Sequence, residues 1–558
     1  MASLQRYSSH GQPYYRIVES FRRSDGKPAV RVLAHLGKAD DLLARIQQQQ
    51  NAVRVFSVSA GAVQAAFDLA TELGLAEQID QAVHQISHQA VQRRDGLTIG
   101  QSLTLAAIAR LCHPCSKRAI AAWAAQTSLP GLFGVSAEVL TSQHFWDQMD
   151  ALPISAVAQA ERSILRRVME TESLALRVLA YDTTNFFTHI DSANARPQLA
   201  QRGHNKQHRH DLRQLGLALV VSEEGQIPLA HALYEGSRND ARSFQQLLAP
   251  LRQQLQALQA EVVQCTLVFD SGPASDANLQ QVVAGGDHYV TALKPSLHKR
   301  LLAEASTQLQ PVTLRGQEQV PAWRTQRTVK GQTQTLVVLR SMKLLAGQKR
   351  GLDQQLNKAL RKLGQLSPHP RQGIEGTRRQ VSRITHRQYL KQVLRVEIAE
   401  VEGRVVVTPR LDAAARQQLE EQYFGLRLLA TTRHDWSTAQ IIEAYRGQAR
   451  VERAFRDLKD PWAGAFRPQY HWTDQKLIVH AFVAVLSLLL GRLLLRRAQR
   501  RVGFTGTVRG LIERLAQIRL ATILQSQGDK GRPRVRTHRE DCPAEIMQLA
   551  QAFGMPTK

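Results

Sequence analysis

The hydrophobic pattern changes its period along the chain, and each change predicts a different structural unit. Residues 14–36 hold two strand-like runs around Asp25-Gly26, a pair of residues that favours a tight hairpin turn. From about residue 60 to 172 the apolar positions recur at helical spacing, and strand signals are few. We therefore expect an N-terminal β-hairpin module over residues 1–50, ending in a polar linker near Gln47 to Asn51, and a helical region over 60–172.

Short strand-like runs begin near residue 173 and alternate with helical ones. The run RVLAYDTTNFF predicts a first strand, and the next two strands are expected on either side of a turn at Glu223 to Gln226. Further along, the pattern predicts a helix, a buried strand, a second helix and a last strand, at Ala241 to Leu258, Cys265 to Asp270, Ser275 to Val283 and Tyr289 to Leu293. This βββαβαβ order is that of an RNase H-like core, so we expect an α/β fold with the first part of the core over residues 173–295.

The core pattern stops after residue 295 and returns later. Residues 296–425 carry densely basic runs such as QKRGLDQQLNKALRKL, which predict an inserted domain. A strand at 426–432, followed by a helix with a capping-box-like start at Ser437, indicates the second part of the core over residues 426–495. The basic tail, residues 496–558, is expected to lie against a phosphate backbone or to be disordered.

One run, Leu477 to Leu490, is almost entirely apolar and could belong either to a membrane span or to a buried core helix. A span needs roughly 20 apolar residues, and this run is about five residues too short. It also contains His480 and ends against Arg492. These features favour the core helix.

Charge narrows the class of partner. The chain has 73 Lys and Arg residues against 47 Asp and Glu residues, a formal net charge of +26. A surplus of this size indicates a polyanionic partner, and nucleic acid is the leading candidate. No signal-peptide pattern is visible at the start of the chain, and only four cysteines occur, so we expect a cytoplasmic protein.

Three carboxylates stand out by their position. Asp182 and Asp270 each end a buried apolar run, VLAY and TLVF, although a single aspartate there is more often a turn or helix-cap residue. The third is Glu452. On one continuous helix, it would share a sector of about 80° with four polar residues, and an apolar sector would lie beside it. The polar residues are Tyr445, Gln448, Arg456 and Lys459, and the apolar ones are Ala444, Val451, Phe455 and Leu458.

A solvated helix with an ion pair between Glu452 and Arg456 is the simpler interpretation, but it does not explain why Tyr445 and Lys459 share that sector. Phosphodiester chemistry explains the whole set. Two magnesium ions about 4 Å apart need hard oxygen ligands and together stabilise the attacking and leaving oxygens. We therefore expect Asp182, Asp270 and Glu452 to be catalytic and to bind two Mg²⁺ ions, for which Mn²⁺ substitutes, with the neighbouring cations on the phosphates.

At these residues the chain resembles the DDE transposases of bacterial insertion sequences. The signature of the insertion-sequence-four type is Tyr, two residues, Arg, three residues, Glu, six residues, Lys. Tyr445, Glu452 and Lys459 stand at that spacing, whereas Gln448 replaces the arginine. YDTTNFF and VFDSGPASDANL are similar to the first and second aspartate motifs of the family.

The resemblance implies a transposase that binds the terminal inverted repeats of its element, cuts the ends with a metal-activated water, and joins the 3′ ends to target DNA. It implies a homodimer on double-stranded DNA, DNA contacts by Tyr445, Lys459 and Arg456, and end recognition by the helical region 60–172. Two alternatives remain open: an RNase H-like nuclease without strand transfer, and an inactive transposase-derived DNA-binding protein.

Two further clusters could bind a metal, but each has a simpler interpretation. Cys112 and Cys115 form a lone CxxC without a second pair at zinc-like spacing, which favours small core thiols. The loop RGHNKQHRHD, residues 202–211, is rich in histidine, a ligand for softer ions than those of the expected core. We expect a basic loop in which Lys206 and Arg209 contact phosphate.

Overall fold

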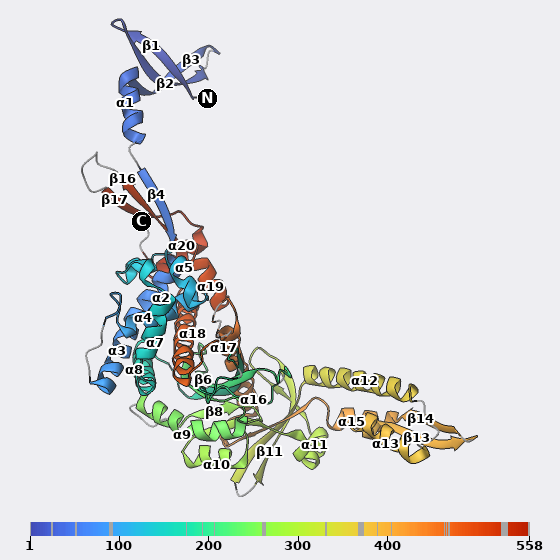
Figure 1. Cartoon of the computed structure of the whole chain (residues 1–558). Coiled ribbons are helices and arrows are strands. Elements are labelled where there is room, and N and C mark those ends of the chain that lie inside the picture. The colour runs from blue at the N-terminus through green and yellow to red at the C-terminus, as the bar shows by residue number, and fades with distance from the viewer. Residues whose placement is uncertain are drawn as a thin grey trace.

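The computed structural model has a large mixed sheet at its centre, with helices on both faces (Figure 1). It describes residues 2–23, 26–50, 53–88, 93–174, 176–191, 193–205, 207–258, 264–329, 332–366, 373–387, 389–402, 404–462, 464, 466, 469–525 and 534–555. Among these, the sheet has the strand order β10-β11-β12-β15-β9-β8-β5-β6-β7. The bounds are β5 (Val178–Thr188), β6 (Arg213–Ser222), β7 (Pro228–Glu235), β8 (Thr266–Phe269), β9 (His288–Leu293), β10 (Gln310–Thr313), β11 (Gln319–Val329), β12 (Gln332–Arg340) and β15 (Leu426–Thr431).

The strands and helices predicted between residues 173 and 295 are confirmed. β5, β6 and β7 form an antiparallel meander, and Gly225 and Gln226 take left-handed conformations in the predicted turn between β6 and β7. β8 and β9 then run parallel to β5, and each is preceded by a helix, α9 (Asp240–Leu258) and α10 (Asp276–Ala284). The predicted strand at 426–432 is β15, which pairs antiparallel with β9.

Alternating residues of the central strands pack into different cores, which separates the two faces of the sheet. Tyr181 of β5 packs with Phe244 of α9 on one face. Ala180, the preceding residue, packs on the other face with α17 (Ala449–Lys459), and Val268 of β8 packs there with α16 (Thr438–Arg446). Because side chains alternate along a strand, this second face also receives Asp182, two residues after Ala180.

The apolar run at Leu477 to Leu490 lies in one long helix, α18 (Asp474–Val502), surrounded by protein. Among the described residues, α18 is the helix that is long and apolar enough to cross a membrane. Of its most apolar 18-residue stretch, 94% is buried inside the protein. It packs against helices of the predicted helical region and thus has the environment of a core helix. That region comprises α2 (Gly61–Glu72), α3 (Leu75–Ser87), α4 (Ile99–Cys112), α5 (Ile120–Ala124), α6 (Leu129–Leu132), α7 (Ser142–Ala151) and α8 (Ile154–Glu172).

For the described part of the tail over 496–558, the expected disorder is wrong, and the alternative of contact with a phosphate backbone stays a prediction. After α18 the chain forms α19 (Val508–Leu515), β16 (Arg519–Gln525), β17 (Arg534–Arg539) and α20 (Ala544–Ala552). Leu511, Leu515, Ile546 and Leu549 are buried in the main core, so apolar residues spaced between the arginines hold the tail on the helical region. β16 also pairs with β4 (Val53–Ser59), which joins the two ends of the chain.

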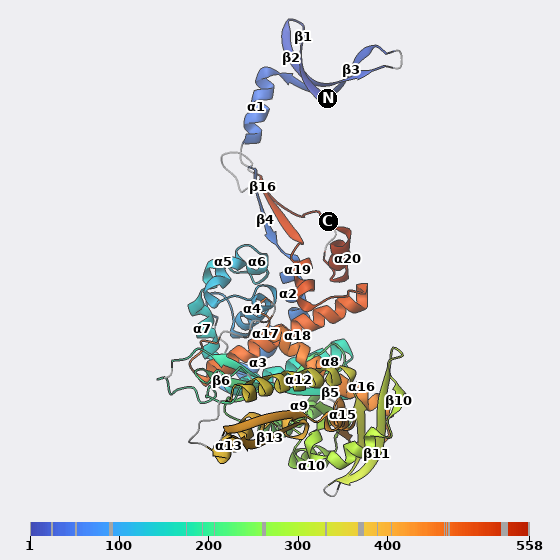
Figure 2. The same ribbon diagram turned by 90° about the vertical axis from the view of Figure 1, so that its right-hand side faces the viewer.

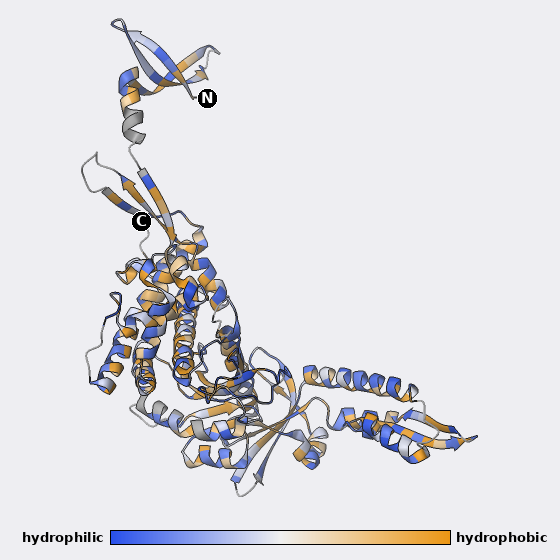
Figure 3. Ribbon diagram, in the orientation of Figure 1, coloured by the Kyte–Doolittle hydropathy of each residue, from blue (hydrophilic) through white to orange (hydrophobic). Residues whose placement is uncertain are grey.

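The boundary expected at residue 296 lies too early. β12 pairs with β15, and β10 and β11 continue the same sheet, so this part of the expected insertion extends the core. A separate core forms only in the module of α12 (Met342–Gly364), α13 (Gly373–Thr385), α14 (Leu390–Val393), β13 (Leu394–Val401), β14 (Arg404–Leu411) and α15 (Ala413–Gln422), which projects from the body (Figure 1). Figure 3 shows hydrophilic and hydrophobic residues following one another along α12, whose buried residues include Leu352, Leu356 and Leu363.

The N-terminal residues form a small module at one end of the molecule (Figure 2). It contains β1 (Ala2–Ser9), β2 (Gln12–Arg22), β3 (Pro28–Lys38) and α1 (Ala39–Gln50). β2 and β3 pair as an antiparallel hairpin, and Asp25 of the predicted turn lies outside the described residues. The polar linker expected from Gln47 is wrong, because α1 continues to Gln50; glutamine is a good helix former, so a polar run alone does not end a helix.

A buried ion-pair network joins the helical region to α18. Arg496, 2% exposed, donates to Glu172 of α8 at 2.5 Å, and Arg497 donates to the other Glu172 oxygen at 2.7 Å. Without Glu172, Arg496 would keep Glu224 at 3.1 Å and Arg497 would keep Glu72 at 2.6 Å, but the most buried carboxylate of the network would be lost. Glu170, in contrast, is half exposed and pairs only with Arg167.

We predict that Glu172→Ala lowers the stability of the helical region by about 1.5 to 3 kcal/mol, because it removes charge-assisted hydrogen bonds to two largely buried arginines. The matched change Glu170→Ala should cost no more than about 1 kcal/mol, because its ion pair faces solvent. Calorimetry of the full chain compares the two unfolding temperatures. Equal shifts would contradict a structural role for the network.

Candidate active site

Two aspartates are brought level by the parallel pairing of β5 and β8. Ala180 lies opposite Val268 in this pair, so Asp182 and Asp270, each two residues further on, lie at the same level and toward the same face. Neighbouring strands are about 4.8 Å apart, which brings both carboxylates within reach of one small ligand. Asp182 accepts a hydrogen bond from the Thr183 amide at 2.8 Å.

The helix expected to carry Tyr445 and Glu452 on one face is in fact two helices. α16 begins with the expected capping box between Ser437 and Gln440 and ends at Arg446. The chain turns at Gly447 and Gln448, where the Gln448 amide bonds to the Tyr445 carbonyl at 3.0 Å, three residues back. A Cβ atom at Gly447 would come within 2.8 Å of a backbone carbonyl oxygen, so this tight corner requires glycine.

Gln448 lies in this corner, between the two helices. It is only 8% exposed, whereas Glu452 is exposed one turn further along α17. The shared sector expected for these two residues on one continuous helix stays a prediction. A period of 3.6 residues describes side-chain directions only while the helix continues.

Tyr445 connects the carboxylates across the corner. Its hydroxyl donates to Asp270 Oδ1 at 3.0 Å, and the Arg427 guanidinium lies 5.3 Å from the centre of its ring. Burial raises the pKa of Tyr445, and the negative charges of Asp270 and Glu452 raise it further. The hydroxyl therefore remains a hydrogen-bond donor at neutral pH, and Glu452 is close enough to act on it electrostatically.

The rest of α17 has the predicted division into two faces. Val451, Ala454, Phe455 and Leu458 are buried against β5, β6 and α18, while Glu452 and Arg456 face solvent. The alternative ion pair between Glu452 and Arg456 is absent from the contacts of these described residues. The Lys459 ammonium donates to Thr184 Oγ1. Thr184 was not among the predicted site residues, although its position two residues after Asp182 on the same strand face was a usable signal.

The donor set fits magnesium in its chemistry. Asp182, Asp270 and Glu452 offer carboxylate oxygens, which Mg²⁺ prefers. Over the described part of the chain, no group of three or more His, Cys, Asp or Glu side chains is gathered closely enough to hold a metal ion. All three carboxylates would therefore share a metal only after coming closer together, and the Tyr445 hydroxyl already engages Asp270.

The histidine-rich loop has an ion pair of its own. Arg209 donates to both carboxylate oxygens of Asp211, at 2.8 and 2.7 Å, and this hydrogen bonding lowers the pKa of Asp211 to about 2. The predicted phosphate contact of Arg209 therefore competes with an exposed local ion pair. Lys206 lies outside the described residues. Cys112 and Cys115 are free thiols, and burial raises the pKa of Cys112 to about 12.

Comparison with known families decides the class of protein. The family model described as "Transposase DDE domain" matches residues 174–485, more than half of the chain. The chain belongs to the DDE transposases. A second model, "IS1634 family transposase, N-terminal domain", matches residues 4–55 of this transposase. Both models agree with the resemblance to transposases of bacterial insertion sequences.

Comparison with solved structures adds a distant neighbour, a piggyBac transposase in a synaptic complex with hairpin DNA. The neighbour is 8% identical, with a TM-score of 0.39, over 81% of the transposase and 79% of the neighbour chain. Among curated proteins no match is found.

We predict that Tyr445→Phe slows DNA cleavage by about tenfold or more, since it removes a hydrogen bond to a charged group. Tyr289→Phe is the matched control, because its hydroxyl is also buried but has no hydrogen-bond partner. Because the pKa of Tyr445 is raised, its ionisation should appear in an absorbance titration above the ordinary tyrosine pKa of about 10. This ionisation step should be missing from Tyr445→Phe. Equal cleavage rates for the two variants would contradict a role for the Tyr445 hydroxyl.

Proposed function

We propose that this transposase cuts the ends of its element and joins them to target DNA with Asp182, Asp270 and Glu452 as ligands of two divalent metal ions. The observation that carries the proposal is the level position of Asp182 and Asp270 on adjacent parallel strands. The Tyr445 hydroxyl donates to Asp270, and the negative charge of Glu452 helps to raise the Tyr445 pKa. These two interactions support the inclusion of Glu452.

The catalytic unit in this proposal is an RNase H-like core. Its support is the element order βββαβαβ together with the spatial order β7-β6-β5-β8-β9, in which β5, β8 and β9 are parallel and β6 is antiparallel. β15, α16 and α17 then complete it. The core in this description covers residues 173–340 and 426–495, interrupted by the projecting module.

Each residue has a distinct role in the reaction. Bound Mg²⁺ or Mn²⁺ would supply Lewis acidity for the phosphate and for the attacking oxygen. Asp182 and Asp270 would hold the metals from the sheet, and Glu452 from the helix. Tyr445, kept protonated, orients the Asp270 carboxylate. Lys459, whose ammonium lies at Thr184, and Arg456 would neutralise phosphate oxygens of the cut strand.

Further parts of the proposal concern DNA and assembly. The spacing of Tyr445, Glu452 and Lys459 supports the insertion-sequence-four branch, although Gln448 departs from its signature. The helical region 60–172 would recognise the inverted repeats, with a homodimer pairing the two ends. Lys206 and Arg209 would add phosphate contacts, and a DNA-acting enzyme of this family would work in the cytoplasm, on the nucleoid.

The decisive experiment uses Asp182→Asn, Asp270→Asn and Glu452→Gln in the full chain. Each should abolish metal-dependent cleavage of element-end DNA and leave DNA binding intact, because the amide keeps the shape but loses the charge that the metals require. The losses should not add in combination, since the three groups act as one unit. Appreciable cleavage by any single variant would remove that residue from the site.

The same assay separates the two alternatives. A pre-cut end with a free 3′ hydroxyl is offered together with target DNA. Joining supports a transposase that completes strand transfer, cutting without joining would indicate a nuclease, and binding without either reaction would indicate an inactive derivative.

A further inference from the structure

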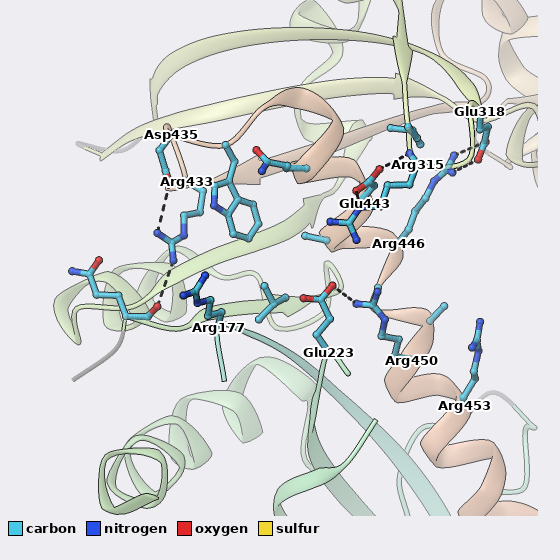
Figure 4. Close-up of a pocket in the computed structure, with 18 residues that line it drawn as sticks. Arg177, Glu223, Arg315, Glu318, Arg433, Asp435, Glu443, Arg446, Arg450 and Arg453 are labelled. Carbon is cyan, nitrogen blue, oxygen red and sulfur yellow. Dashed lines mark hydrogen bonds and ion pairs between the residues drawn. The ribbon is translucent and has the colours of Figure 1, made fainter. Parts of the chain in front are cut away.

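A cleft of about 1020 Å³, shown in Figure 4, lies at the end of the sheet opposite Asp182 and Asp270. Its lining includes Val178 at the start of β5 and Gln264 just before β8. Because β5 and β8 are parallel, these residues mark the N-terminal ends of the strands, whereas Asp182 and Asp270 lie further along both strands. Val178 and Asp182 are four residues apart on an extended strand, about 13 Å. The cleft is therefore separate from the two aspartates, while Glu452 follows them on α17 next to the lining residue Arg453.

Arginine dominates the charge of this cleft. Six guanidinium groups from segments far apart in the sequence surround it, together with four carboxylates, as Figure 4 shows. The arginines are Arg177, Arg315, Arg433, Arg446, Arg450 and Arg453. The positive surplus is concentrated on two of them, since among the described residues no ion pair involves the side chain of Arg177 or Arg453, and both are exposed.

The other four arginines are held by carboxylates of the same lining. Arg446 bonds to both oxygens of Glu318, at 2.6 and 3.0 Å, and Arg450 bonds to Glu223 at 3.0 Å. The remaining pairs are Arg315 with Glu443 at 3.1 Å and Arg433 with Asp435 at 3.9 Å. Exposed ion pairs contribute little to stability, so a phosphate can take the place of a carboxylate. Guanidinium groups bind phosphate through two parallel hydrogen bonds.

The lining also excludes an ordinary small-molecule site. Such sites are mostly apolar with a few polar groups, whereas ten of the eighteen lining residues here are charged. The two arginines without an ion pair, Arg177 before β5 and Arg453 on α17, come from separate elements, and in Figure 4 Glu223 and Arg450 lie between them. Repeated phosphates along a nucleic-acid strand match the distribution of the charges.

We propose that this cleft binds the phosphodiester backbone of a DNA segment other than the one held at the carboxylates. The segment would lie on the outer side of the Gly447 and Gln448 corner, whose inner side carries Tyr445 toward Asp270. The proposal depends on the action of the family on DNA and is independent of the assignment of the metal ligands.

The first test is a fluorescence titration of random-sequence duplex DNA with the full chain, in EDTA and at several salt concentrations. Arg177→Gln combined with Arg453→Gln should weaken binding by about tenfold or more and reduce the salt slope by about two, because two phosphates are no longer neutralised. The control Arg300→Gln with Arg361→Gln removes the same charge from two exposed arginines on α11 (Lys299–Ser306) and α12. An equally large weakening in the control, or unchanged binding in the cleft variant, would overturn the proposal.

The second test asks what occupies the cleft. A photoreactive amino acid replaces Ala449, an exposed residue of the lining, and the labelled duplex is added. A crosslink that disappears in the Arg177 and Arg453 double variant supports the proposal. Absence of a crosslink overturns it. Complete suppression of the crosslink by millimolar inorganic phosphate would identify a small-anion site and overturn the proposal as well.

EDTA excludes metal chemistry from both tests, so a failure of the catalytic assignment leaves their outcomes unchanged.

Discussion

Parallel pairing of β5 with β8 is the constraint on which the catalytic arrangement depends. The two strands are short in their shared part, from Val178 to Ala180 on β5 and from Thr266 to Val268 on β8. A shift of one residue in this register would turn one aspartate toward the opposite face, because strand side chains alternate. β6 pairs antiparallel with β5 on one side, and β9 pairs parallel with β8 on the other, so both strands are fixed and the register is protected.

The helical corner has the complementary role. Gly447 lets the chain turn within two residues, so that α16 packs over β8 and β9 while α17 packs over β5 and β6. Tyr445 at the end of α16 thereby reaches Asp270, and Glu452 follows on a separate helix, α17. The outer side of the same corner borders the arginine-lined cleft, so one turn of the backbone separates two differently charged surfaces.

Local sequence patterns predicted the helices and strands of the core well. The features that depend on pairing between distant segments could not be predicted in the same way. Asp182, Asp270 and Glu452 could be found because each has a local signal, the end of an apolar run or an amphipathic helix. The corner at Gly447 could not be read from periodicity, since glycine is tolerated within helices at a modest cost. The pairing of β12 with β15 joins residues about 90 positions apart, and no local pattern specifies which sheet edge an amphipathic strand will extend.

The central claim is that one metal site lies between β5, β8 and α17, and replacing the metal tests it most directly. Fe²⁺ bound in place of Mg²⁺, with peroxide and a reductant, generates hydroxyl radicals that cut the polypeptide beside the ion. The account predicts backbone cuts near Asp182, Asp270 and Glu452 in the full chain with element-end DNA, suppressed by excess Mg²⁺. Cuts that map elsewhere, or cuts near the aspartates without any near Glu452, would contradict it.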